Sequence, residues 1–97
     1  MKIGTIKKIE SVDDIYPLTV ISDRYGGTYS NGKYLAFNTY FYNLERDIAG
    51  DDTDCNSFWC DFEEGKIQFL FCGKGNTPEE AINQLLEQLQ KAQAAAI

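Results

Sequence analysis

The residues of this 97-residue chain that could do chemistry are a run of carboxylates, three cysteines and one Asp–Arg pair. In the carboxylate run, Asp52, Asp54 and Asn56 have the spacing of positions 1, 3 and 5 of a calcium-binding loop, and Glu63 stands at position 12. Ser57 occupies the position at which such a loop needs glycine for its sharp turn. The sequence therefore favours a solvated acidic loop over a calcium site.

The three cysteines fit the spacing of a structural zinc site only loosely, and they lack a convincing fourth ligand. Cys55 and Cys60 are separated by four residues, and Cys72 lies in an alternating apolar run. Zinc sites favour cysteine pairs about two to four residues apart, commonly with histidine, and this chain has no histidine. An odd number of cysteines is also a poor disulfide framework. We therefore expect reduced thiols and no bound metal.

Asp23 and Arg24 are the one pair that could form an active-site carboxylate with a phosphate-binding arginine. The alternative is a salt bridge that anchors a turn, which contributes little to stability when it is exposed. Without an imidazole, no serine or cysteine has a base to activate it. Gly26–Gly27 lacks both the spacing of a phosphate-binding loop and a following helix. We expect no catalytic residues and no cofactor.

The net charge of −6 is concentrated in one part of the chain. Residues 45–64 hold eight acids and one base, a local net charge of −7, and the other residues are nearly neutral in sum. An acidic surface repels the phosphates of nucleic acid, so direct nucleic-acid binding is not expected. The same surface attracts a basic one, which predicts a protein partner with a basic surface.

All six tyrosines fall between Tyr16 and Tyr42. If this region forms a β-ribbon, alternation places its tyrosines on both faces, and exposed tyrosines are enriched at recognition surfaces. Ordinary cross-strand pairing of aromatic rings is the other interpretation. Phe58–Trp59, inside the acidic run, either anchors that run to the core or is an exposed contact for a partner.

The predicted partner-binding surface combines the acidic segment with tyrosines of the preceding ribbon. We expect the carboxylates to attract the basic partner and the aromatic rings to supply contact area. The members of this surface are Tyr25, Tyr29, Tyr34, Asp47, Asp51, Asp52, Asp54, Trp59, Asp61, Glu63 and Glu64.

The elements that must position these residues begin with a hairpin. Asn31–Gly32 separates two aromatic, β-prone runs, which is typical of a type I′ turn with both central residues at positive φ. The corresponding register pairs Tyr29 with Tyr34 and places Gly26–Gly27 at a bulge. The alternative is that residues 24–32 form one long exposed loop.

The clearest helix begins at Thr77. Thr77 can cap the helix, Pro78 suits the first helical position, and Glu80 can complete a capping box. An apolar stripe follows at helical spacing over residues 82–89, so this helix should cover one face of a sheet.

The remaining elements complete a small antiparallel sheet of three to four strands. Residues 18–22 and 66–72 have the composition and alternation of β-strands, and residues 2–9 alternate more loosely. Residues 43–49 predict a short helix, followed by an irregular stretch to residue 64. The fold class expected is α+β, with the C-terminal amphipathic helix packed on one face of the sheet.

The length of the chain supports one hydrophobic core, so we expect a single domain over residues 1–97 with an acidic insertion at about 43–65. The first residues become charged before any long apolar run develops, so no secretory signal is predicted. No stretch approaches the ~20 apolar residues that span a bilayer. A cytoplasmic protein without membrane contact is expected.

The stretch LTVISDRYGGTYSNGKYLAFN, residues 18–38, resembles the start of small proteins carried by phages and bacterial mobile elements. The resemblance extends over about residues 16–86 and includes a GDD segment, the pair Phe58–Trp59 and a GNTPEEAI helix start. That group has no assigned activity, and proteins from such neighbourhoods include inhibitors of host defence. The resemblance implies a protein of that kind.

The stretch GKGNTPEEAINQLLEQL, residues 73–89, is similar to the core of HicB-type antitoxins. In that family a short sheet precedes a G-x-T-x-E-E-A helix start, which matches well over residues 73–86, while the strands match in outline. Residues 39–65 would be an acidic insertion that the compact form of the family lacks. No helix-turn-helix follows Leu89, so the resemblance does not imply promoter binding.

These observations predict a non-enzymatic, intracellular acidic binding protein. Its action would be to occlude a basic, nucleic-acid-binding partner, as a phage or mobile-element inhibitor of host defence would. A HicB-like antitoxin and a module that binds calcium or another small ligand are the alternatives. The edge of the hairpin could also pair with a second copy, so a homodimer is left open.

Overall fold

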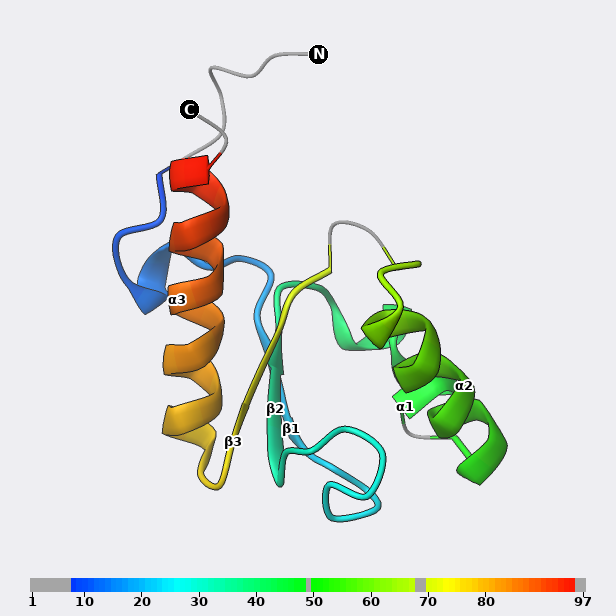
Figure 1. The fold of residues 1–97 in the computed structure, drawn as a ribbon. Helices are drawn as coiled ribbons and strands as arrows, with labels where there is room; N and C mark the ends of the chain where they lie inside the picture. The colour runs from blue at the N-terminus through cyan, green and yellow to red at the C-terminus, as the bar shows by residue number, and fades with distance from the viewer. Residues whose placement is uncertain (1–7, 49, 68–69, 96–97) are drawn as a thin grey trace.

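The computed structural model describes residues 8–48, 50–67 and 70–95. Its centre is a three-stranded antiparallel sheet in the order β1–β2–β3 (Figure 1). Val20 on β1 pairs with Ala36 on β2, and Ala36 pairs with Gly73 on β3. The strands are β1 (Thr19–Ser22), β2 (Tyr34–Phe37) and β3 (Cys72–Gly75).

Helices cover both faces of this sheet, as Figure 1 shows. Helix α3 (Pro78–Ala95) lies on one face, and α1 (Glu45–Ile48) and α2 (Asp52–Glu63) lie on the other. Two 3-10 helices, Val12–Asp14 and Phe41–Asn43, precede β1 and α1. Among the described residues, no helix combines the length and the apolar character needed to cross a membrane. The α+β class and the C-terminal helix on the sheet are confirmed.

Alternation along β2 divides the core into two clusters. Leu35 and Phe37 point towards α1 and α2 and pack in a cluster with Trp59. Ala36, between them, points towards α3 and packs in a second cluster with Leu85. All of these side chains are buried, so the central strand joins both layers to one sheet.

The start of α3 is built as the sequence predicts. The Glu80 N–H donates to Thr77 Oγ1 at 3.1 Å, which is the expected cap. The Glu80 carboxylate accepts from the Asn76 N–H at 2.8 Å, one residue before the predicted partner. One orphan donor of the first turn, the Glu80 N–H, is thereby satisfied together with the Asn76 N–H just before the helix, which begins at Pro78.

The predicted hairpin at Asn31–Gly32 is wrong, and the alternative of a long loop is correct. Strand pairing stops at Ser22 and Tyr34, and the Asp23 N–H closes the loop by donating to the Lys33 carbonyl at 2.8 Å. Gly26 and Gly27 have φ values of +65° and +97°, which an extended strand cannot accommodate. The loop is not fully exposed, because Ser30 within it is completely buried.

The third strand lies nearer the C-terminus than the predicted 66–72 segment, of which residues 68–69 lie outside the described residues. It runs over Cys72–Gly75, and its two glycines lie directly against α3. A Cβ at Gly73 would be 2.0 Å from the Ala81 carbonyl oxygen, so no larger residue fits. The predicted strand at 2–9 falls mostly outside the described residues, and Lys8 and Ile9 are not in a strand.

The predicted short helix near 43–49 is present as α1, but the irregular stretch to residue 64 is wrong. Most of that stretch forms α2, in which Cys55, Phe58 and Trp59 are buried. Phe58 and Trp59 pack in one cluster with Leu35 and Phe37 of β2. This burial outweighs the low helix propensity of its Asp, Asn, Ser and Thr residues.

Candidate partner-binding surface

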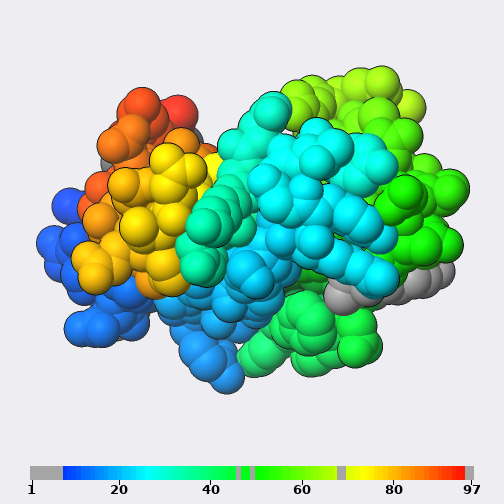
Figure 2. All heavy atoms as spheres, turned by 90° about the horizontal axis from the view of Figure 1, so that it is seen from below, coloured from blue at the N-terminus to red at the C-terminus, as the bar shows by residue number. Residues whose placement is uncertain are grey.

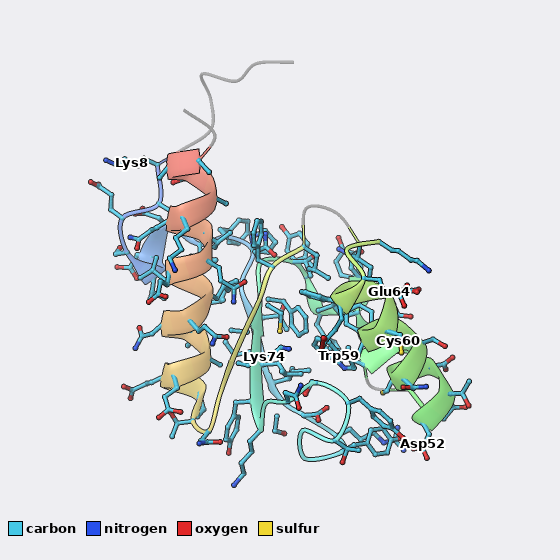
Figure 3. The ribbon with its side chains drawn as sticks, in the orientation of Figure 1. Lys8, Asp52, Trp59, Cys60, Glu64 and Lys74 are labelled. Carbon is cyan, nitrogen blue, oxygen red and sulfur yellow. The ribbon has the colours of Figure 1, made fainter. Side chains whose placement is uncertain are left out.

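Helix α2 presents the acidic segment on one side because its apolar residues occupy the other. Cys55, Phe58 and Trp59 face the core, and Phe62 packs partly against the same cluster. The Asp51 carboxylate caps the helix by accepting from the Asp54 N–H at 3.0 Å. Figure 3 shows Asp52 and Glu64 at opposite ends of this helix, pointing away from the sheet, and Trp59 pointing towards it.

The carboxylates of α2 and its flanks are therefore fixed in position at the surface. Lys66 pairs with Glu64 at 2.9 Å and approaches Asp61 at 3.9 Å. Within the described ranges, no ion pair to Asp52 or Asp54 is found. The exposed members of the predicted surface are Asp51, Asp52, Asp54, Asp61, Glu63 and Glu64, while Asp47 is half-buried.

Two shallow hollows lie beside these carboxylates. One, of about 380 Å³, is lined by Asp47, Asp54 and Asp61 together with Ser57, Phe58 and Ile67. The other, of about 420 Å³, shares Asp47, Phe58 and Ile67 with the first. Its remaining lining residues are Asn38, Thr39, Asn43, Leu44 and Leu70. Because the hollows share Asp47, Phe58 and Ile67, they form one acidic groove whose lining also includes apolar side chains.

The loop between β1 and β2 meets the N-terminal end of α2. Arg24 Nη1 donates to the Gly50 carbonyl at 2.7 Å, and the Tyr25 hydroxyl donates to the same oxygen at 3.3 Å. Two effects raise the pKa of Tyr25 above its usual value: partial burial, which is the larger, and a hydrogen bond with Asp52. Two parts of the predicted surface, Tyr25 and Asp52, are thus adjacent although 27 residues separate them in the sequence.

The other predicted aromatic residues lie elsewhere. Tyr29 contacts Tyr25 edge to face, with centroids 5.6 Å apart, and packs partly against the α2 core cluster. Tyr34 packs against the α3 cluster on the opposite face of the sheet from the acidic segment. Trp59 is 3 % exposed and packs against Phe37, Phe58 and Phe62, so it anchors α2 and is not an exposed contact.

A tyrosine cluster that the predicted surface omitted is more exposed. Tyr16, Tyr40 and Tyr42 are 82 %, 40 % and 72 % exposed. The Tyr40 hydroxyl donates to the Tyr16 hydroxyl at 3.0 Å, and the Tyr40 ring stacks on Tyr42 with centroids 5.3 Å apart. Thr19 pairs with Phe37, so extending the β1–β2 register by three residues sets Tyr16 opposite Tyr40. The Asn31–Gly32 turn predicts a different register, which does not place these two tyrosines opposite each other.

The other chemistry-bearing residues, Asp23, Cys55 and Cys72, lie in the β1–β2 loop and among the buried residues. The Asp23 carboxylate accepts one hydrogen bond from the Gly27 N–H and another, of 3.2 Å, from the Ser30 hydroxyl. These two bonds anchor the long loop. Cys55 and Cys72 are buried free thiols, and burial raises the pKa of Cys72 to about 12. The residues with the spacing of a calcium-binding loop, Asp52, Asp54, Asn56 and Glu63, all lie on α2 and therefore do not form a loop.

The third thiol, Cys60, is exposed on α2. In the parts of the chain that the structure describes, no group of three or more acidic, cysteine or histidine side chains is placed to hold a metal ion. Comparisons of this chain with protein-family models, with curated proteins and with solved structures find no match.

Proposed function

We propose that this chain is a non-enzymatic binding protein whose acidic α2 surface covers the basic, nucleic-acid-binding surface of a partner protein. The observation that carries the proposal is the construction of α2. Its apolar side is locked into the core by Phe58 and Trp59, and its other side carries exposed carboxylates. The acidic segment is therefore a preformed helical surface, which loses less entropy on binding than a flexible loop would.

The spacing of the carboxylates supports recognition of a surface that otherwise binds phosphates. Asp54 and Asp61 are two helical turns apart on the same side of α2, which is about 10 Å along the helix axis. Asp47 of α1 faces the same groove. An array of fixed negative charges raises the association rate with a basic partner and competes directly with nucleic acid for it.

The resemblance of residues 16–86 to proteins of phages and mobile elements suggests the biological setting of this binding protein. An intracellular protein carried by a phage or mobile element would use such a surface to inhibit a host-defence protein that acts on nucleic acid. Occlusion requires no catalytic residue and no cofactor.

The experiment compares two sets of charge reversals with equal changes in net charge. Asp52→Lys, Asp54→Lys and Asp61→Lys alter the α2 surface, and Glu10→Lys, Glu79→Lys and Glu87→Lys alter exposed acids outside that surface. Each immobilised variant captures proteins from a bacterial lysate, and captured proteins are tested for binding to labelled DNA and RNA. We expect wild type and the control set to capture a nucleic-acid-binding protein and to release its nucleic acid.

The α2 set should lose that capture and that release. If it captures the same protein and displaces nucleic acid as well as wild type does, the α2 surface is not the binding site. If the captured protein still binds nucleic acid in the complex, the occlusion mechanism is wrong.

A second candidate is a HicB-like antitoxin. The observation that favours it is a three-stranded antiparallel sheet whose last strand, β3, leads directly into α3, which agrees with the outline that the resemblance implies. Helices α1 and α2 lie between β2 and β3, where the resemblance places an insertion. The captured partner separates the two candidates, because an antitoxin restores growth to cells that express its partner toxin. A captured partner whose expression does not harm cells would count against the antitoxin.

A further inference from the structure

The tyrosine cluster adjoins the acidic groove. Thr39 and Asn43 line the larger hollow of the groove, and the Asn43 side-chain amide donates to the Thr39 hydroxyl at 3.0 Å. Tyr40 follows Thr39 in the chain, and Tyr42 precedes Asn43. The same short segment therefore supplies one wall of the groove and two rings of the cluster.

The rings of the cluster are held in place before any partner binds. Tyr16 meets Tyr40 edge to face, with centroids 5.9 Å apart, and Tyr40 lies nearly parallel to Tyr42. The hydrogen bond to Tyr16 is the main cause of the raised pKa of Tyr40. Figure 2 shows the segments around residues 15–17 and 40–43 protruding next to each other at its lower edge. Exposed rings fixed in this way are a contact surface with little entropy left to lose.

We propose that the acidic groove and the tyrosine cluster together bind an extended, arginine-rich segment of the partner. The inference rests on the proposed function and deepens it by naming the chemistry of the segment that is bound. Carboxylates at Asp47, Asp54 and Asp61 match the positive charges, and the apolar lining at Phe58 and Ile67 contacts the aliphatic stems. The tyrosine faces stack against guanidinium groups.

Arginine fits this surface better than lysine for a physical reason. The guanidinium group is planar, weakly hydrated and able to stack on an aromatic face while it hydrogen-bonds a carboxylate in its own plane. The ammonium group of lysine is compact and strongly hydrated, so an exposed tyrosine attracts it less. The chain itself contains one contact of each kind, with the Arg24 guanidinium 5.4 Å from the Tyr25 ring centroid and the Lys74 ammonium 5.2 Å from the Trp59 ring centroid. The expected preference for arginine therefore rests on the chemistry of the two cations at exposed rings.

A second copy of this chain is a poorer occupant of the surface. Each copy has a net charge of −6, and the groove is lined by three aspartates. If two copies met through this face, their aspartates would repel one another, and this repulsion disfavours self-association there.

The test uses two peptides of equal length and charge, hexa-arginine and hexa-lysine, both with blocked ends. Isothermal titration at low salt measures their binding to wild type, to the double variant Tyr16→Ala/Tyr42→Ala, and to Tyr42→Phe. We expect wild type to bind hexa-arginine about two- to fivefold more tightly than hexa-lysine, the factor that an exposed cation–π contact supplies. The double variant should lose this preference, and Tyr42→Phe should keep it, because it keeps the ring.

The α2 charge-reversal set separates this inference from the proposed function. Suppose that both peptides bind wild type with equal affinity and that neither binds the α2 charge-reversal set. Charge recognition by the acidic surface is then supported, and the preference for arginine is overturned. A preference for arginine that survives in Tyr16→Ala/Tyr42→Ala also overturns the inference, since the discrimination then lies elsewhere. If neither peptide binds wild type, the inference and the proposed charge recognition both fail.

Discussion

Trp59 on α2 packs against Phe37 on β2, with ring centroids 6.2 Å apart and planes inclined by 34°. Figure 3 shows the Trp59 side chain directed from the helix towards the sheet and Lys74. The Lys74 ammonium lies 5.2 Å from the Trp59 ring centroid, so β3 also contacts the tryptophan. The position of the acidic helix on the sheet depends on these contacts.

Replacing Trp59 with alanine should destabilise the protein by about 3–5 kcal/mol, since a buried indole is removed and a cavity remains. The free energy of unfolding is measured by urea denaturation followed by circular dichroism. Tyr42→Ala serves as the control, because Tyr42 is exposed and its loss should cost no more than about 0.5 kcal/mol. Equal effects of the two variants would contradict the anchoring role of Trp59.

Gly73→Ala should prevent α3 from packing normally on β3. The new Cβ would lie 2.0 Å from the Ala81 carbonyl oxygen and 2.4 Å from the Leu85 nitrogen, both of which are backbone atoms. We expect a loss of about 3 kcal/mol or more in the free energy of unfolding, measured by thermal and urea denaturation. In Gly65→Ala, the new Cβ meets no atom within 4 Å, so only the strain of a φ of +74° contributes. A Gly73→Ala variant no less stable than Gly65→Ala would refute the close packing.

Two glutamines of α3 hydrogen-bond backbone groups of β3, an edge strand of the sheet. The Lys74 N–H donates to Gln84 Oε1 at 2.6 Å, and Gln88 Nε2 donates to the Cys72 carbonyl at 2.8 Å. Gln84→Ala should therefore speed hydrogen exchange of the Lys74 amide by about two- to tenfold, as loss of one hydrogen bond implies. Exchange followed by NMR gives this rate, and Asn83→Ala on the exposed side of α3 is the control. An unchanged Lys74 rate in Gln84→Ala would show that the bond does not protect the edge.

The buried thiol of Cys72 predicts a loss of stability at alkaline pH. Burial raises its pKa to about 12 in the folded protein, against 9.0 for the unperturbed thiol. Above pH 9 the unfolded chain releases this proton while the folded chain retains it, so the free energy of unfolding falls as pH rises. The stabilisation is fully present below pH 9 and is lost towards pH 12.

The measurement compares wild type with Cys72→Ala at several pH values between 9 and 11. Wild type should lose about 1.4 kcal/mol per pH unit more than the variant, the value for one proton. Parallel pH profiles for the two proteins would show that Cys72 does not titrate in this way.

Local sequence signals predicted the elements that depend on neighbouring residues. The start of α3 follows from Thr77, Pro78 and Glu80, whose caps form within one turn. Strand β1 follows from a run of β-branched residues. The sequence also contains a local signal for α2, since Cys55, Phe58, Trp59 and Phe62 have helical spacing and Asp51 is a good cap.

The sequence alone determined the acidic segment, its net charge and the absence of histidine from these 97 residues. The sequence did not determine which tyrosines are exposed. That depends on the register between β1 and β2, which the glycines and the Asp23 hydrogen bonds set within a long loop. The glycine strand β3 forms by pairing with β2, and it needs glycine because α3 packs so closely on it that no larger side chain fits. Registers and close approaches involve residues far apart in the chain, so only the tertiary structure decided them.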